Sequence, residues 1–177
     1  MRIVSGTCRG RIIDPPHGLK ARPTTDFAKE NIFNVLSNLY DFEGLEVLDL
    51  FSGTGSISYE FASRGAARVI SVEAERLHHS FIAQTAAKMK LTAIKAVLGD
   101  AFNFVRHSAD KFDIIFADPP YDLEQADTLP DMVMSGGLLN QTGMFILEHS
   151  KHKDFSQHPC FRQQRRYGSV NFSIFEP

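Results

Sequence analysis

The feature that most constrains the fold is a regular alternation of short apolar runs with helix-length segments from residue 46 onward. The apolar runs, rich in Val, Ile and Leu, are typical of buried strands. The segments between them repeat apolar residues every three or four positions, the period of a helix packed on one face. Strands joined by such helices form a parallel sheet covered on both faces. The sequence therefore predicts strands at 47–50, 68–72, 94–98, 112–117 and 144–148, and helices at 56–63, 76–91, 101–107 and 123–134.

Both ends of the chain depart from this alternation. Residues 2–5 and 11–13 predict a small β-hairpin, and a helix is expected over 27–40, with Thr24 or Thr25 as its cap. The C-terminal stretch "FRQQRRYGSVNFSIFE" predicts two strands that turn at Tyr167-Gly168 and add an antiparallel edge to the sheet. We therefore expect an α/β protein with an N-terminal hairpin extension over 1–26 and one domain over 27–177.

The first strand of the alternation ends in a glycine-rich turn, "VLDLFSGTGSIS". Gly53 and Gly55 let a ligand approach the start of the following helix closely. A dinucleotide fingerprint would have a third glycine at position 58, where this chain has Ser58. Asp49 would repel a pyrophosphate but can hold an ammonium group. The turn therefore favours a cofactor that carries an amino acid over NAD.

The next two strands also end in carboxylates. Glu73 can accept hydrogen bonds from both hydroxyls of a ribose, because a carboxylate offers paired acceptors. Asp100 can accept from the N6 amine of an adenine, with Ala101 or Phe102 beside the ring. Ligands of open α/β sheets bind at the carboxyl ends of the strands. Together with Asp49, these residues predict a site for a nucleoside-bearing cofactor.

The fourth strand runs into "DPPY", residues 118–121. Asp118 and the carbonyl of Pro119 can accept the two hydrogens of an exocyclic amine, and the fixed φ angles of Pro119 and Pro120 aim that carbonyl. Such acceptors favour rehybridisation of the amine and direct its lone pair at an electrophilic methyl group. Tyr121 offers a ring on which a flipped-out base can stack, worth about 1–3 kcal/mol. The motif therefore predicts methyl transfer to an amine without a metal.

Charge is distributed unevenly along the 177 residues. Residues 1–22 carry a net charge of +4, residues 23–150 of −9 and residues 151–177 of +3. Basic ends around an acidic centre suit a polyanionic partner gripped by the termini. The two cysteines lack metal-ligand spacing, and no apolar run approaches the roughly 20 residues of a membrane span. We expect a cytoplasmic protein with reduced thiols, no metal and no membrane partner.

The motifs "DLFSGTG" (49–55) and "DPPY" together resemble the S-adenosylmethionine-dependent amino-methyltransferases. More narrowly, the chain resembles the RsmD type, which methylates the N2 amine of a guanine in 16S rRNA. The shorter motifs that carry this resemblance are "RGR" (9–11), "GLKARPTTD" (18–26), "ENIFNVL" (30–36), "SRGA" (63–66) and "GDA" (99–101). The resemblance implies a Rossmann-like class I methyltransferase fold with a mainly parallel, seven-stranded sheet.

The resemblance also implies roles for particular residues. It assigns the amine-binding role to Asp118, Pro119, Pro120 and Tyr121. The charge of the basic N-terminus, and not the resemblance, places the expected RNA contacts at Arg9 and Arg11. Cofactor contacts are implied at Arg22, Thr24, Asp49, Phe51, Gly53, Gly55, Glu73, Asp100 and Ala101. Cys8 and Phe27 depart from the family pattern, which has an aromatic and a basic residue there.

The expected partner is 16S rRNA, within a partly assembled small ribosomal subunit, and the expected state is a monomer. Two other functions remain open from the residues alone. A DNA adenine-N6 or cytosine-N4 methyltransferase would share residues 118–121, although the chain shows no separate target-recognition domain. An RNA-binding module that has lost catalysis would need no intact series of cofactor residues. A dehydrogenase is disfavoured by Asp49 and Ser58.

Overall fold

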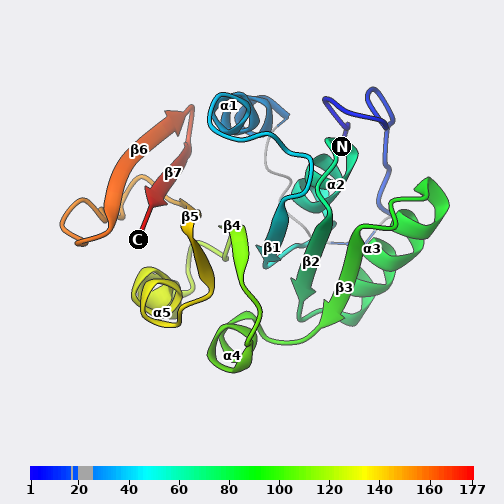
Figure 1. The fold of residues 1–177 in the computed structure, drawn as a ribbon. Coiled ribbons are helices and arrows are strands. Elements are labelled where there is room, and N and C mark those ends of the chain that lie inside the picture. Colours follow the sequence, from blue (N-terminus) through cyan, green and yellow to red (C-terminus); the bar gives the residue numbers. More distant parts are fainter. Residues whose placement is uncertain (17, 20–25) are drawn as a thin grey trace.

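The computed structural model describes residues 1–16, 18, 19 and 26–177. Within them, seven strands form one sheet in the order β3-β2-β1-β4-β5-β7-β6 (Figure 1). Strands β1 to β5 pair in parallel, and β7 is antiparallel to both β5 and β6. The expected Rossmann-like sheet with an antiparallel C-terminal edge is confirmed. The strands are β1 (Glu46–Leu50), β2 (Arg68–Glu73), β3 (Ile94–Leu98), β4 (Phe112–Ala117), β5 (Leu139–His149), β6 (Phe161–Tyr167) and β7 (Val170–Phe175).

Helices cover both faces of the sheet, as Figure 1 shows. On one face, Ile32, Phe61 and Ile82 bring three helices into a single apolar cluster. On the other face, Phe102 and Val133 belong to a second cluster. Complete burial of such side chains stabilises the fold by about 1.5–3 kcal/mol each. The helices are α1 (Asp26–Ser37), α2 (Ser56–Ser63) and α3 (Arg76–Met89) on the first face, and α4 (Ala101–His107) and α5 (Leu129–Ser135) on the second.

The N-terminal segment packs directly against the first face. Ile3, Cys8 and Ile13 are buried in the same cluster as α1 and α2. The expected hairpin is reduced to one antiparallel bridge, between Arg2 and Ile12. The predicted boundary between residues 26 and 27 stays a prediction, and the expected helix caps Thr24 and Thr25 lie outside the described residues.

Two details of the sequence-based elements are wrong. The expected helix over 123–134 is a 3-10 helix, η1 (Glu124–Thr128), followed by α5. The break precedes Pro130, because proline lacks an N–H and fits only the first turn of a helix. The helical period of residues 76–91 also predicts that Leu77 faces inward, whereas Leu77 is 72% exposed. The face that α3 buries consists of Ile82, Thr85 and Ala86. Leu77 lies off this face, because helical residues five positions apart point in directions about 140° apart.

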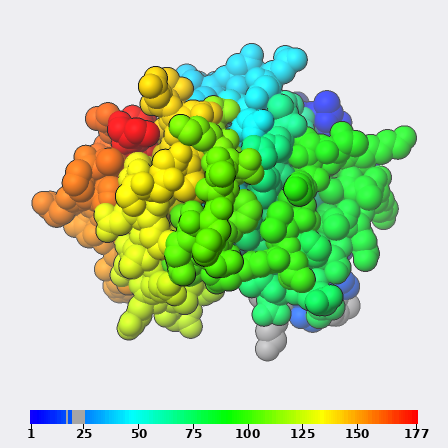
Figure 2. All heavy atoms as spheres, turned by 60° about the horizontal axis from the view of Figure 1, so that its bottom comes forward, coloured from blue at the N-terminus to red at the C-terminus, as the bar shows by residue number. Residues whose placement is uncertain are grey.

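The other boundaries differ from expectation by a few residues, except that β5 begins five positions before residue 144. Figure 2 shows the C-terminal hairpin, in orange and red, on the opposite side of the molecule from the green part of the chain that contains α3. Among the described residues, no helix is long and apolar enough to cross a bilayer.

Candidate active site

The strand order creates a cleft beside β1. The chain leaves β1 for β2 on one side and later crosses to β4 on the other side, which is a topological switch point. A cleft of about 520 Å³ opens there, within the 300–1,000 Å³ of sites for small ligands. Its lining includes most of the residues predicted from the sequence: Asp49, Phe51, Gly53, Glu73, Asp100, Ala101, Asp118, Pro119, Pro120 and Tyr121.

Some predicted residues are not part of this lining. Gly55 closes the turn before α2, where its N–H donates to the carbonyl of Ser52 at 2.7 Å. Arg9 and Arg11 are exposed on the N-terminal segment and do not line the cleft. Arg22 and Thr24 lie outside the described residues, so their roles stay predictions.

The turn between β1 and α2 has an unusual backbone. Gly53 and Gly55 have φ angles of 53° and 84°, and a Cβ at position 55 would lie 2.8 Å from the ring of Tyr59. Phe51 also has a positive φ, 57°, which is rare for a bulky residue and costs on the order of 1 kcal/mol. Its ring meets that of Phe102 edge-on, with centroids 5.7 Å apart. The strained residue therefore holds an aromatic edge at the cleft.

Asp49 is buried at the floor of the cleft, with 2% of its surface exposed. Its Oδ2 accepts a hydrogen bond from Ser58 Oγ at 2.5 Å, and Ser58 Oγ also lies 2.5 Å from Ser71 Oγ. Burial raises the pKa of the Asp49 carboxyl to about 7, although the hydrogen bonds from Ser58 and Ser52 oppose the shift. Ser58, which replaces a fingerprint glycine, therefore holds the carboxylate expected to receive an ammonium group.

Glu73 closes the same turn from the neighbouring strand. Its Oε2 accepts from the backbone N–H of Gly53 at 2.7 Å, and its Oε1 from that of Glu75 at 2.8 Å. The imidazole Nδ1 of His78 lies 3.9 Å from Oε1. Each carboxylate oxygen has a second lone pair, so these bonds are compatible with ribose hydroxyls as further donors. Glu73 therefore shapes the glycine turn as well as lining the cleft.

Asp100 begins α4 as its N-cap. Its Oδ1 accepts from the backbone N–H of Asn103 at 2.8 Å, which satisfies one free donor of the first helical turn. Ala101 follows as a small buried residue on the cleft wall. The cap fixes the carboxylate of Asp100 beside the small apolar side chain of Ala101 in the cleft lining, an arrangement that suits an adenine ring.

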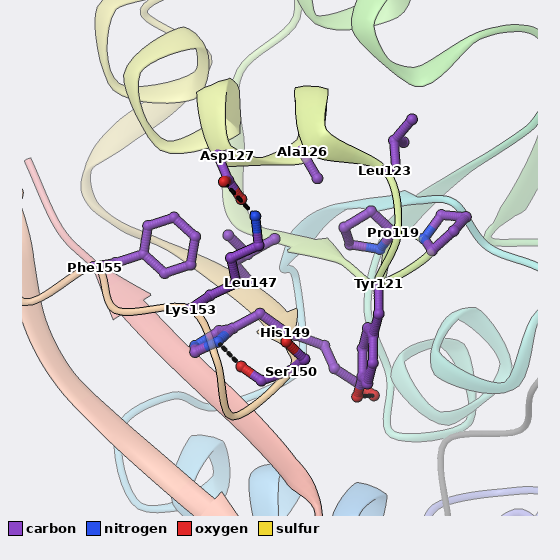
Figure 3. A pocket seen from close by; sticks show the side chains of 12 residues that line it. Pro119, Tyr121, Leu123, Ala126, Asp127, Leu147, His149, Ser150, Lys153 and Phe155 are labelled. Carbon is purple, nitrogen blue, oxygen red and sulfur yellow. Dashed lines mark hydrogen bonds and ion pairs between the residues drawn. The ribbon is translucent and has the colours of Figure 1, made fainter.

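Residues 118–121 leave β4 at the open end of the cleft. The N–H of Asp118 is 3.5 Å from the carbonyl of Leu50, which continues the β1–β4 pairing by one weak step. Pro119 is buried and Pro120 is exposed, so the chain turns outward between them. Tyr121 is half-buried, and its hydroxyl donates to Glu148 Oε1 at 3.0 Å. Figure 3 shows the Tyr121 side chain extending away from Pro119 and from the Asp127–Lys153 ion pair.

Glu148 is the residue that the sequence-based reasoning missed. It lies near the end of β5, is 2% exposed, and contacts the predicted tyrosine. The signal was present in "MFILEHS", where an apolar run is followed by a carboxylate, as in the four strands before it. Ser58 and His78 were also not expected to contact Asp49 and Glu73.

No group of three or more His, Cys, Asp or Glu side chains suited to a metal ion occurs in residues 1–16, 18, 19 and 26–177. The described residues that line the cleft supply carboxylates, backbone carbonyls and aromatic rings. These groups accept hydrogen bonds from amines and hydroxyls and stack on flat rings. Such an arrangement fits a nucleoside-bearing cofactor and a second, amine-bearing nucleobase.

Comparisons with known proteins find similarity over nearly the whole length of the chain. The family model described as conserved hypothetical protein 95 matches residues 1–176. The "Putative rRNA methyltransferase YlbH" of Bacillus subtilis is 30% identical, with 99% of this chain and 98% of the relative covered. The "Ribosomal RNA small subunit methyltransferase D" of Escherichia coli K12 is 25% identical, with 99% and 89% covered.

Solved structures agree with the sequence matches. A structure titled "Putative methyltransferase yhhF from Escherichia coli" superposes with a TM-score of 0.85 at 26% identity and covers 99% of this chain and 96% of that one. A methylase structure from Haemophilus influenzae has the same fold, with a TM-score of 0.79 at 23% identity, and covers 98% and 96%. Fold, site and sequence thus converge: the chain belongs to the family described as conserved hypothetical protein 95, the RsmD-type family, and has the Rossmann-like fold of class I S-adenosylmethionine-dependent methyltransferases.

Proposed function

We propose that this protein methylates the exocyclic N2 amine of a guanine in 16S rRNA, with S-adenosylmethionine as the methyl donor. The observation that carries the proposal is the cleft itself, in which Asp49, Glu73 and Asp100 lie beside residues 118–121. The names of the B. subtilis and E. coli relatives, both rRNA methyltransferases, support rRNA as the substrate. The choice of guanine N2 rests on the resemblance to the RsmD type.

The cofactor would lie across the carboxyl ends of β1, β2 and β3. Glu73 would accept the ribose hydroxyls, Asp100 the adenine amine, and Asp49 the methionine ammonium, directly or through water. Arg22 and Thr24 are proposed to reach the methionine end. When bound, the cofactor supplies a methyl group on a positively charged sulfur, which needs no activation by a metal.

The task of the protein is to prepare the amine. A guanine N2 amine is a poor nucleophile because its lone pair is delocalised into the ring. Asp118 and the Pro119 carbonyl would accept its two hydrogens, draw the nitrogen towards sp³ geometry and aim the lone pair at the cleft. Tyr121 would hold the flipped base by stacking. Arg9 and Arg11 would bind RNA phosphates outside the cleft.

The substrate would be rRNA within a partly assembled small subunit, and the protein would act as a cytoplasmic monomer. The test is mass spectrometry of 16S rRNA from a strain that lacks the gene. One N2-methylguanine should disappear, and the wild-type gene should restore it. An unchanged rRNA together with a lost methyl mark in DNA would favour the adenine-N6 or cytosine-N4 alternative.

The same strain separates catalysis from binding. Asp118→Ala should restore no methylation, while calorimetry on the purified variant should show S-adenosylmethionine affinity close to that of the wild type. Asp122→Ala is the matched control, because Asp122 is an exposed carboxylate in the same loop. Loss of cofactor binding in Asp118→Ala would reassign Asp118 to the cofactor site.

A further inference from the structure

Glu148 lies beside Asp118 where the carboxyl ends of the neighbouring strands β4 and β5 meet. Strands β4 and β5 are parallel, and Ala117 pairs with Leu147, so Asp118 and Glu148 follow one position later on adjacent strands. Neighbouring strands are about 4.8 Å apart. A carboxylate that is 2% exposed is costly to bury unless it accepts hydrogen bonds. Because Glu148 is buried next to the proposed amine site, we expect its carboxylate to accept a hydrogen bond that matters for that site.

One hydrogen-bond partner of Glu148 is the tyrosine of the motif that contains Asp118. Tyr121 Oη donates to Glu148 Oε1 at 3.0 Å, a hydrogen bond to a carboxylate, which is stronger than one between neutral groups. The Tyr121 backbone is restrained by Pro119 and Pro120, which precede it. The ring is thus fixed at both ends: by the prolines at its Cα and by β5 at its hydroxyl.

We propose that Glu148 is a positioning residue that fixes the Tyr121 ring, through the phenol hydroxyl, in the plane on which the target base stacks. The inference rests on the proposed function, in which Tyr121 carries the base. β4 would supply the acceptor for the amine and β5 the anchor for the ring. The distance between amine and ring is then set by paired strands and not by a loop, which favours precision. It also gives a reason for tyrosine in place of phenylalanine.

A double-mutant cycle between Tyr121→Phe and Glu148→Met tests the coupling. Methionine keeps the length of the side chain without its acceptors. Each single variant should lower kcat/KM for rRNA methylation about tenfold or more, the effect of a lost hydrogen bond to a charged group. The loss should fall mainly on kcat, because phosphate contacts elsewhere hold the RNA. The double variant should be little worse than either single variant.

Two further variants separate positioning from simple stabilisation. Glu148→Gln keeps an acceptor oxygen and should recover most of the activity lost in Glu148→Met. A second, smaller pocket next to the cleft is lined by Tyr121 and Glu148 and also by Lys153 and Asp127 (Figure 3). Lys153→Met breaks the partly exposed Lys153–Asp127 pair of this pocket and should show no coupling to Tyr121→Phe. S-adenosylmethionine affinity should stay within about twofold in all variants, well under 1 kcal/mol.

The outcomes of these experiments test the positioning role of Glu148 separately from the proposed function on which it rests. Two results would overturn the positioning role and leave the proposed function intact. One is additive effects of Tyr121→Phe and Glu148→Met on kcat/KM. The other is a loss of S-adenosylmethionine affinity in Glu148→Met as large as its loss of kcat/KM. A wild-type protein that methylates no RNA would overturn the proposed function, and the positioning role with it. A strong non-additive loss confined to kcat supports both.

Discussion

At the scale of single residues, Asp49 carries a carboxyl group where its charged form is costly. Burial raises its pKa to about 7, whereas an unfolded aspartate titrates near 3.9. The folded protein therefore holds the proton more tightly than the unfolded chain. The resulting stabilisation is complete below about pH 4 and is lost as the pH rises through about 7. Asp49→Asn should remove this contribution.

The measurement is the free energy of unfolding in urea at intervals from pH 4 to pH 8. The difference between wild type and Asp49→Asn should shift by a few kcal/mol over this range, in the direction of a relatively weaker wild type at high pH. The exposed Asp122→Asn is the control and should follow the wild type. Parallel curves for wild type and Asp49→Asn would mean that Asp49 titrates normally in the folded protein.

Glu73 has two tasks that its variants should separate. It accepts from the backbone at Gly53 and Glu75, and it is proposed to accept the ribose hydroxyls. Glu73→Ala should raise the S-adenosylmethionine Kd about tenfold or more, since hydrogen bonds to a charged group contribute about 1.5–3 kcal/mol. Glu73→Gln, which retains one acceptor oxygen, should bind with intermediate affinity. An unchanged Kd in Glu73→Ala, measured by calorimetry, would contradict the ribose assignment.

At the scale of elements, helix α2 joins the cofactor turn to the N-terminal segment. Glu60 on this helix is fully buried and accepts from the N–H groups of Val4 and Ser5 at 2.8 and 3.0 Å. One turn later, Ser63 Oγ accepts from the N–H of Cys8 at 2.9 Å and donates to the carbonyl of Ser5 at 2.6 Å. The loop that carries Arg9 and Arg11 is therefore held by side chains of α2.

Gly6 tests this attachment. Its φ is 81°, and a Cβ there would lie 1.8 Å from the carbonyl oxygen of Ser63, so Gly6→Ala must push the segment off α2. Gly10 is a matched control, since its φ is 80° but nothing lies within 4 Å of a Cβ. Both variants carry a left-handed strain of about 1–2 kcal/mol, and only Gly6→Ala adds a clash.

Gly6→Ala should therefore lower the melting temperature several degrees more than Gly10→Ala. It should also weaken binding of a 16S rRNA fragment while leaving S-adenosylmethionine affinity unchanged. Scanning calorimetry and filter binding measure these quantities. Equal effects of the two substitutions would show that the contact between the segment and α2 does not govern the position of the loop.

The elements that the sequence predicts well are those whose signal is local. The strands and helices from 46 to 117 alternate with clear periods, and α2, β3, α4 and β4 begin and end where expected. The carboxylates at the strand ends could be placed together because parallel strands share one edge. The partners of these side chains could not be predicted, because the contacts of Asp49 with Ser58 and of Tyr121 with Glu148 depend on how separate segments pack.

At the scale of the whole molecule, the fold separates the two basic ends of the chain. The N-terminal segment lies against α2, whereas β6, with Arg162, Arg165 and Arg166, is the far edge strand of the sheet (Figure 1). The acidic centre contains the cleft, which is proposed to hold a positively charged cofactor. An RNA that contacts both ends would therefore have to span the molecule from the side of α2 to β6.

The salt dependence of RNA binding tests whether the basic N-terminal loop contacts the RNA phosphates. Replacing both Arg9 and Arg11 by Gln should weaken binding of a 16S rRNA fragment. It should also reduce the slope of log K against log salt by about 1.4–1.8, the value for two lost phosphate contacts. The matched pair is Lys88→Gln with Lys90→Gln, which removes the same charge from exposed positions around the end of α3. That pair should leave the slope nearly unchanged, because net charge alone does not release counterions from the RNA. If both pairs reduced the slope equally, binding would follow overall charge, and the basic N-terminal loop would have no specific place on the RNA.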